Sequence, residues 1–89
     1  LPRARVNLAM GMAERERYDE AVEQLEAALD TDSRFITAWA QLARIELLRN
    51  NETGLKRALE GLRALDPGLA DRFAHEFEQS LPHNGGPSP

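Results

Sequence analysis

Two histidines are the side chains in this 89-residue sequence best suited to bind a metal ion. His75 is followed by Glu76, as in the zinc-binding pattern H-E-x-x-H, in which a second histidine follows the first by four positions. That position holds Gln79, and the other histidine, His83, lies near the end of the sequence. Because the chain has no cysteine, no thiolate can complete a site. We expect no metal ion.

The sequence also lacks the patterns that activate a nucleophile or hold a phosphate group. No glycine elbow or base lies at motif spacing from the three serines, Ser33, Ser80 and Ser88. No strand is predicted, so no glycine-rich phosphate loop can follow one. We therefore expect no cofactor and no catalysis, and the protein is not predicted to be an enzyme.

The charge and the apolar pattern of the sequence argue against two classes of partner, nucleic acids and membranes. The net charge of −4 argues against nucleic acid, because neutralising phosphates needs a basic surface. No apolar run is long enough to span a membrane. The sequence begins at Leu1 without a methionine and looks like a piece of a longer protein. Lys56 is its only lysine beside many arginines, and this bias fits a bacterial source. No compartment signal is present; a cytoplasmic location is favoured and a periplasmic one stays open.

Five helices are predicted, because apolar residues recur every three or four positions, the period of one helix face. The predicted helices span residues 3–16, 19–30, 34–49, 52–65 and 69–81. Asp66-Pro67-Gly68 is the strongest break between them, since proline cannot continue a helix. Residues 82–89 are too poor in apolar side chains to pack, and a disordered tail is predicted there. The expected fold class is all-α.

An internal repeat organises these helices. When the sequence is aligned with itself at a shift of 34 residues, Leu8 coincides with Leu42 and Ala9 with Ala43. Other identical pairs also coincide without a gap, and the breaks between helices of the first repeat coincide with those of the second. A fixed period of about 34 residues is the signature of a helical repeat protein. The two repeats are predicted at residues 2–35 and 36–69.

The repeat resembles the tetratricopeptide (TPR) repeat family. The family's tryptophan, leucine and small residue are matched by Trp39, Leu42 and Ala43, and its closing turn by Asp66-Pro67. The sequence departs from the family at five positions, namely Arg5, Ser33, Glu46, Leu55 and Leu62. The resemblance implies a superhelix (solenoid) of two helical hairpins, with residues 69–81 as a capping helix.

In this family, the first helix of each repeat lines a concave groove that binds peptides or helices. The residues that the resemblance places in this groove are Arg3, Val6, Met10, Ala13 and Glu14 from the first repeat, and Thr37, Ala40, Arg44, Leu47 and Leu48 from the second. The clamp that some members use to hold acidic chaperone tails needs lysine and asparagine at the positions of Val6 and Met10 and asparagine at the position of Gln41. None of the three is matched. Val6 and Met10 could instead pack on a preceding repeat.

Three other features have both a structural and a functional interpretation. Glu46 points near the core, so we expect its carboxylate either to reach the rim or to pair with an arginine such as Arg49 or Arg57. An acidic stripe on the second helix is either a solvated face or a surface for a basic partner; it comprises Asp19, Glu23, Glu26 and Asp30. Phe73 and Phe77 are expected to pack the capping helix onto the domain.

The sequence thus predicts a scaffold that binds a protein or peptide partner in its groove. One alternative is a homo-oligomerisation module, in which the first hairpin or the groove packs on a second copy. Another is an accessory domain of an enzyme whose catalytic part lies elsewhere in a longer chain.

Overall fold

The structure, a computed structural model, describes residues 1–80, and all five predicted helices form within that range. They are α1 (Pro2–Glu14), α2 (Tyr18–Thr31), α3 (Ile36–Leu48), α4 (Glu52–Leu65) and α5 (Pro67–Ser80). No strand is present among residues 1–80, so the all-α class is confirmed. The predicted tail and Leu81, the last residue of the predicted fifth helix, lie outside the described residues.

Helix α5 begins two residues before its predicted start at Leu69. Proline suits the first turn of a helix, because its missing N–H would have no partner there. The side chain of Asp66 accepts a hydrogen bond from the backbone N–H of Leu69 at 3.1 Å and so caps this first turn. The segment Asp66-Pro67-Gly68 therefore ends α4 and starts α5 with almost no loop between them.

The two hairpins have the same internal boundaries. The starts of α1 and α3, Pro2 and Ile36, are separated by one full repeat, and the starts of α2 and α4, Tyr18 and Glu52, keep the same offset. The helix ends share this offset too. Glu16 and Asn50, which are equivalent positions of the two repeats, have positive φ values of 61° and 57°, in the left-handed region. The helix bounds and the two left-handed residues thus keep the same 34-residue offset as the sequence.

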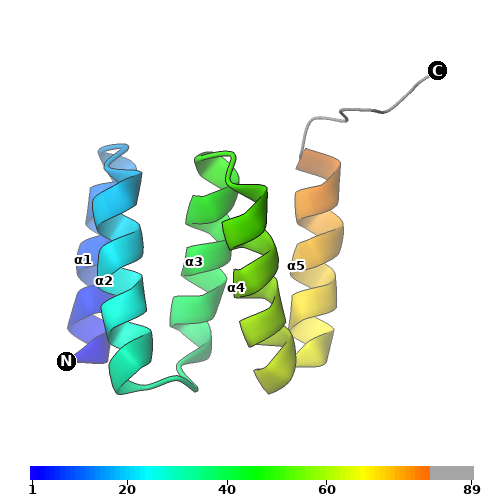
Figure 1. Ribbon diagram of the computed structural model, residues 1–89, viewed down its shortest axis with the longest axis horizontal. Helices are drawn as coiled ribbons and strands as arrows, with labels where there is room; N and C mark the ends of the chain where they lie inside the picture. Colours follow the sequence, from blue (N-terminus) through cyan, green and yellow to red (C-terminus); the bar gives the residue numbers. More distant parts are fainter. Residues whose placement is uncertain (81–89) are drawn as a thin grey trace.

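The helices stand side by side in chain order (Figure 1). Each packs on the next helix along the chain, and α1 also packs on α3. Because consecutive helices reverse direction, α1 and α3 run the same way, with α2 in contact with both. The predicted superhelical arrangement of TPR type stays a prediction.

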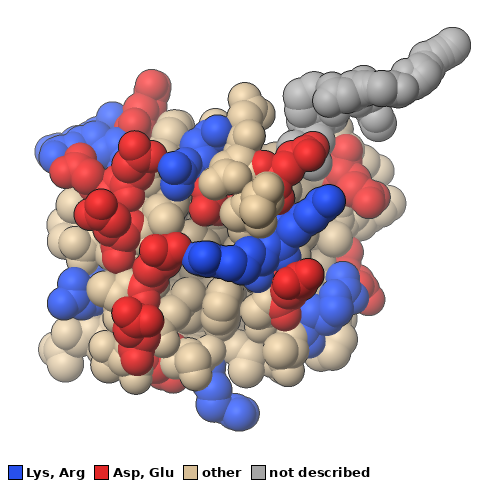
Figure 2. All heavy atoms as spheres, viewed as in Figure 1, with Lys and Arg blue, Asp and Glu red and all other residues tan. Residues whose placement is uncertain are grey.

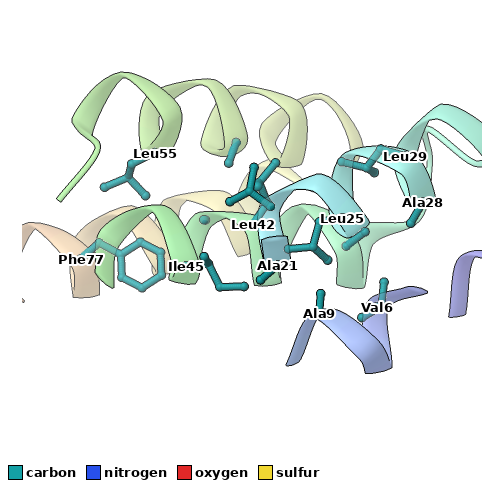
Figure 3. Close-up of a cluster of buried hydrophobic side chains, with 14 residues drawn as sticks. Val6, Ala9, Ala21, Leu25, Ala28, Leu29, Leu42, Ile45, Leu55 and Phe77 are labelled. Atoms are coloured by element: carbon teal, nitrogen blue, oxygen red, sulfur yellow. The ribbon is translucent and has the colours of Figure 1, made fainter. Parts of the chain in front are cut away.

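Small side chains let the helices approach closely at the centre of the stack. Every described helix contains at least one alanine with no exposed surface, and these alanines are Ala9, Ala21, Ala28, Ala38, Ala43, Ala58 and Ala70. Leu25, Leu42, Ile45 and Leu62 are the largest fully buried side chains. Figure 3 shows how Val6 and Ala9 of α1 join the cluster that continues through Leu25 and Leu42 to Phe77. One core therefore runs through both hairpins and the last helix.

Trp39 fixes the second hairpin to the turn that precedes it. Its indole N–H donates a hydrogen bond to the backbone carbonyl of Ser33 at 2.9 Å. The ring lies over Gly61 of α4, where a Cβ atom would come within 2.5 Å of ring carbons. Only glycine leaves room for this ring on α4.

Replacing Gly61 by alanine should therefore destabilise the fold. In a helix interior alanine is normally better than glycine by up to about 1 kcal/mol. At residue 61 the clash of the alanine Cβ with Trp39 should instead make alanine less stable than glycine, because overpacking a tight site costs about 1–3 kcal/mol. We expect Gly61→Ala to lower the free energy of unfolding by about 1 kcal/mol in urea denaturation.

Gly11→Ala is the matched control, since a Cβ there meets nothing within 4 Å. This change should raise stability by about 0.5–1 kcal/mol. Equal stabilisation by both alanine variants would contradict the close contact between Trp39 and Gly61.

Candidate functional site

A groove lies between α1 and α3, the first helices of the two hairpins. Met10, Ala13 and Glu14 line it from α1, and Gln41, Arg44, Ile45 and Leu48 line it from α3. Its volume is about 260 Å³, the space of one or two side chains of a partner. Both walls are regular helices, so the groove exists without any loop having to close.

Five of the residues that the sequence places in a groove lie together here. Met10, Arg44 and Leu48 are joined by Ala13 and Glu14. Met10 and Leu48 are 39% and 54% exposed, which leaves apolar surface on both walls. The groove therefore combines two exposed apolar side chains with one acid and one base.

Other residues predicted for the groove lie elsewhere. Val6 is buried in the core with 3% exposure, and Leu47 and Ala40 are half-buried, Leu47 against the same core. Arg3 and Thr37 are exposed but do not line the groove. Val6 differs from the expectation because its side of α1 faces the chain's own second and third helices.

Two lining residues were not predicted as groove residues. Gln41 and Ile45 lie one helical turn apart on the side of α3 that faces α1. The sequence pattern identifies Ile45 as a core residue, and it is indeed 2% exposed. It forms the floor of the groove, which only the packing of α1 beside α3 creates.

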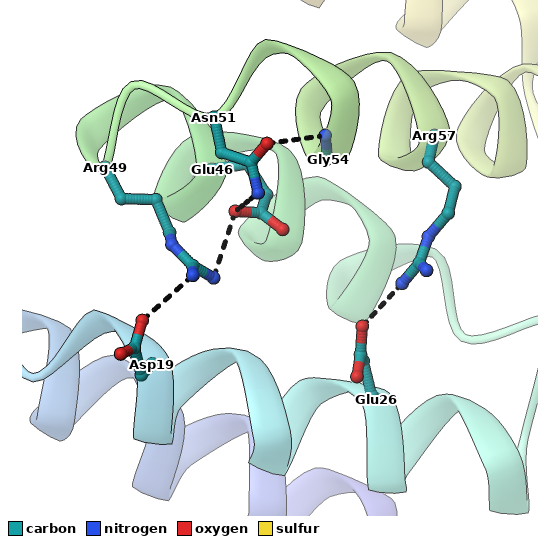
Figure 4. Close-up of polar contacts among 7 residues, drawn as sticks. All are labelled: Asp19, Glu26, Glu46, Arg49, Asn51, Gly54 and Arg57. Atoms are coloured by element: carbon teal, nitrogen blue, oxygen red, sulfur yellow. Dashed lines mark hydrogen bonds and ion pairs between the residues drawn. The ribbon is translucent and has the colours of Figure 1, made fainter.

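The acidic stripe on α2 is partly neutralised within the chain. Figure 2 shows acidic side chains running down the face formed by α2. Asp19 pairs with Arg49 at 2.9 Å, and Glu26 pairs with Arg57 of α4 (Figure 4). These pairs link the first hairpin to the second, so part of the stripe has a structural use.

Glu46 is the one buried charged residue of the described chain, with 4% exposure. Its Oε1 atom lies 3.3 Å from the Arg49 guanidinium, as predicted, and accepts a hydrogen bond from the Asn51 amide at 3.3 Å (Figure 4). Asn51 in turn accepts a hydrogen bond from the backbone N–H of Gly54, and a side chain on Gly54 would strike the Glu46 carboxylate. Within residues 1–80, no buried polar side-chain atom lacks a partner. This network is satisfied and structural.

Two further hollows lie away from the groove. One, at the α1–α2 turn, is polar and includes Arg17, Glu20 and Arg49. There the hydrogen bond from Arg17 lowers the pKa of the exposed Glu20 carboxyl and raises the pKa of Arg17. The other, between α4 and α5, is apolar and includes Leu55 and Phe77.

The aromatic row of α5 faces the domain. Phe77 is 8% exposed, and its ring centroid lies 5.6 Å from that of Phe73. The opposite side of α5 is exposed and polar, with Asp71, Arg72 and His75. The two ends of the stack thus differ, because α1 leaves Leu8 half exposed at the other end.

Removing Arg49 should cost more stability than removing an arginine from an exposed pair. Arg49→Met leaves the buried Glu46 charge with Asn51 alone, so we expect a loss of about 1–3 kcal/mol in urea denaturation. Adding Glu46→Leu to this variant should recover most of the loss, because an apolar pair replaces the ion pair.

Arg57→Met is the control, because both members of the Arg57–Glu26 pair are largely exposed. Its effect should stay below about 1 kcal/mol. If both single variants lose the same stability, or if Glu46→Leu adds a further loss, the proposed role of the network is wrong.

Comparison with known proteins adds no family. No protein-family model, curated protein or solved structure matches the chain. Among residues 1–80, no helix is long and apolar enough to cross a membrane, and no group of three or more acidic, histidine or cysteine side chains gathers as metal ligands would. The resemblance to the tetratricopeptide family stays an expectation based on the sequence.

Proposed function

We propose that this chain is a protein-interaction module of the tetratricopeptide type, which binds a partner segment in the groove between α1 and α3. One observation carries the proposal: the groove lies between the first helices of two hairpins and leaves Met10 and Leu48 exposed on opposite walls. The module acts by binding alone, without a cofactor or turnover.

The shape of the groove favours a helix as the bound segment. No sheet edge is present among residues 1–80, so a partner cannot bind by adding a strand. A helix laid along two parallel helices can instead place an apolar stripe between them. Since the walls are regular helices held by the common core, little ordering is needed on binding.

Charged substitutions on the groove walls should weaken binding strongly. Peptides would be selected from a random phage-displayed library on the immobilised chain, then synthesised with a fluorescent label. We expect Met10→Glu and Leu48→Glu each to weaken binding about tenfold or more in fluorescence anisotropy, because each places a charge where an apolar side chain must be buried.

Leu8→Glu is the matched control. Leu8 is 50% exposed, close to the 54% of Leu48, but it does not line the groove. It lies two residues from Met10, hence on the opposite side of α1. Binding that survives both groove variants, or that is lost in Leu8→Glu, would rule out the groove as the binding surface.

A second function is favoured by the exposed end of the stack. Ala38, Leu42 and Ile45 of α3 are buried between the hairpins with 0%, 1% and 2% exposure. Their equivalents on α1, Ala4, Leu8 and Gly11, are all exposed. We propose as the alternative that this face of α1 pairs with the same face of a second copy. The polar outer side of α5 offers no such surface, so the pairing would be closed and two-fold.

Self-association can be tested by light scattering over a dilution series. If α1 pairs two copies, the mean mass should rise with concentration towards twice the monomer mass. The mean mass of the Leu8→Glu variant should stay at that of the monomer. A mass that stays monomeric at every concentration excludes this alternative and leaves the groove proposal intact.

A further inference from the structure

The groove contains two charges that no other side chain of residues 1–80 neutralises. Glu14 and Arg44 are exposed and line opposite walls. Neither side chain makes a hydrogen bond or ion pair with any part of residues 1–80, whereas Arg17, Arg49, Arg57 and Arg63 are all paired with acids. Two open charges of opposite sign thus remain beside the exposed apolar side chains.

The repeat fixes how these side chains are arranged. Met10 and Arg44 are equivalent positions of the two repeats, and so are Glu14 and Leu48. Since α1 and α3 run the same way, equivalent positions lie at similar heights along the groove. Met10 therefore lies level with Arg44, and Glu14 lies level with Leu48 about 6 Å further along, one helical turn away.

The four side chains form an alternating pattern. The apolar pair, Met10 and Leu48, occupies one diagonal of the groove, and the charged pair, Glu14 and Arg44, occupies the other. A bound segment that complements these four side chains needs apolar side chains against Met10 and Leu48. It also needs a base near Glu14 and an acid near Arg44.

We propose that the groove selects an amphipathic helix that carries an acidic and a basic residue one turn apart beside its apolar stripe. The acid pairs with Arg44 and the base with Glu14. This inference rests on the proposed function, because it requires that a helix occupies the groove. Paired charges at the rim of an interface chiefly select the partner and its register, while the apolar contacts hold it.

Charge reversal tests the pairing directly. The probe is a labelled peptide selected on the unaltered chain, and its selected relatives should be enriched in an acid and a base one turn apart. Arg44→Glu should weaken binding about threefold to tenfold. Replacing the acid of the peptide by lysine should restore affinity for Arg44→Glu while weakening binding to the unaltered chain. Glu14→Lys should behave in the same way with the base of the peptide replaced by glutamate.

Arg72→Glu supplies the control, since Arg72 is exposed on the outer side of α5, away from the groove. It makes the same change in net charge and should leave affinity unchanged. Circular dichroism should show unaltered helix content in all variants, because each changed side chain is exposed. Arg44→Gln, which removes the charge without reversing it, should give a smaller loss than Arg44→Glu.

The outcomes separate the inference from the proposed function. The inference is wrong, and groove binding still holds, if Met10→Glu abolishes peptide binding but neither charge reversal changes it. If Met10→Glu weakens the binding of no selected peptide, both the inference and the proposed function are wrong. A dimer of the free chain that Met10→Glu dissociates would also overturn the inference, because a second copy would then fill the groove.

Discussion

Neither hairpin of this chain has a core of its own, and the packing of one hairpin on the other is the constraint on which the structure depends. Two short helices expose too much surface to be stable alone. Ala38, Leu42 and Ile45 of α3, which packs on both hairpins, are almost fully buried, whereas their equivalents on α1 are exposed. Alanines at the contacts allow the helices to come close enough for one continuous core. The interface between the hairpins is therefore a main source of stability for both.

The position of the groove follows from this packing. Helix α2 contacts both α1 and α3, so these two helices are held beside each other in the same direction although they are not adjacent in the chain. Ion pairs from Asp19 to Arg49 and from Glu26 to Arg57 cross between the hairpins and oppose sliding of one along the other. The groove walls are therefore set by the core and by these pairs, and the groove is formed by the chain alone.

Local patterns in the sequence were sufficient to predict the five helices, because helix periodicity depends on neighbours three and four positions apart. The sequence left open whether Glu46 reaches the rim or pairs with Arg49 or Arg57, and the structure pairs it with Arg49, three positions away. The two sides of α1 were harder to assign. Leu8 has the same place in its repeat as Leu42, yet it is 50% exposed, while Val6 is 3% exposed. Burial in a repeat depends on what lies on both sides of it, and α1 has a neighbour on one side only. The contact of Trp39 with Gly61 was likewise not predictable, since it joins two helices across space.

The small size of the groove indicates why charge should matter to its specificity. A volume of about 260 Å³ accommodates one or two apolar side chains, and burying each contributes about 1.5–3 kcal/mol at most. Many amphipathic helices could supply that stripe, so apolar contact alone would discriminate poorly among them. Glu14 and Arg44 add a requirement that most such helices fail to meet, because a like charge placed opposite either of them is repelled. Under the proposed function, Met10 and Leu48 would hold a helix in this small groove, and the two charges would select which helix binds.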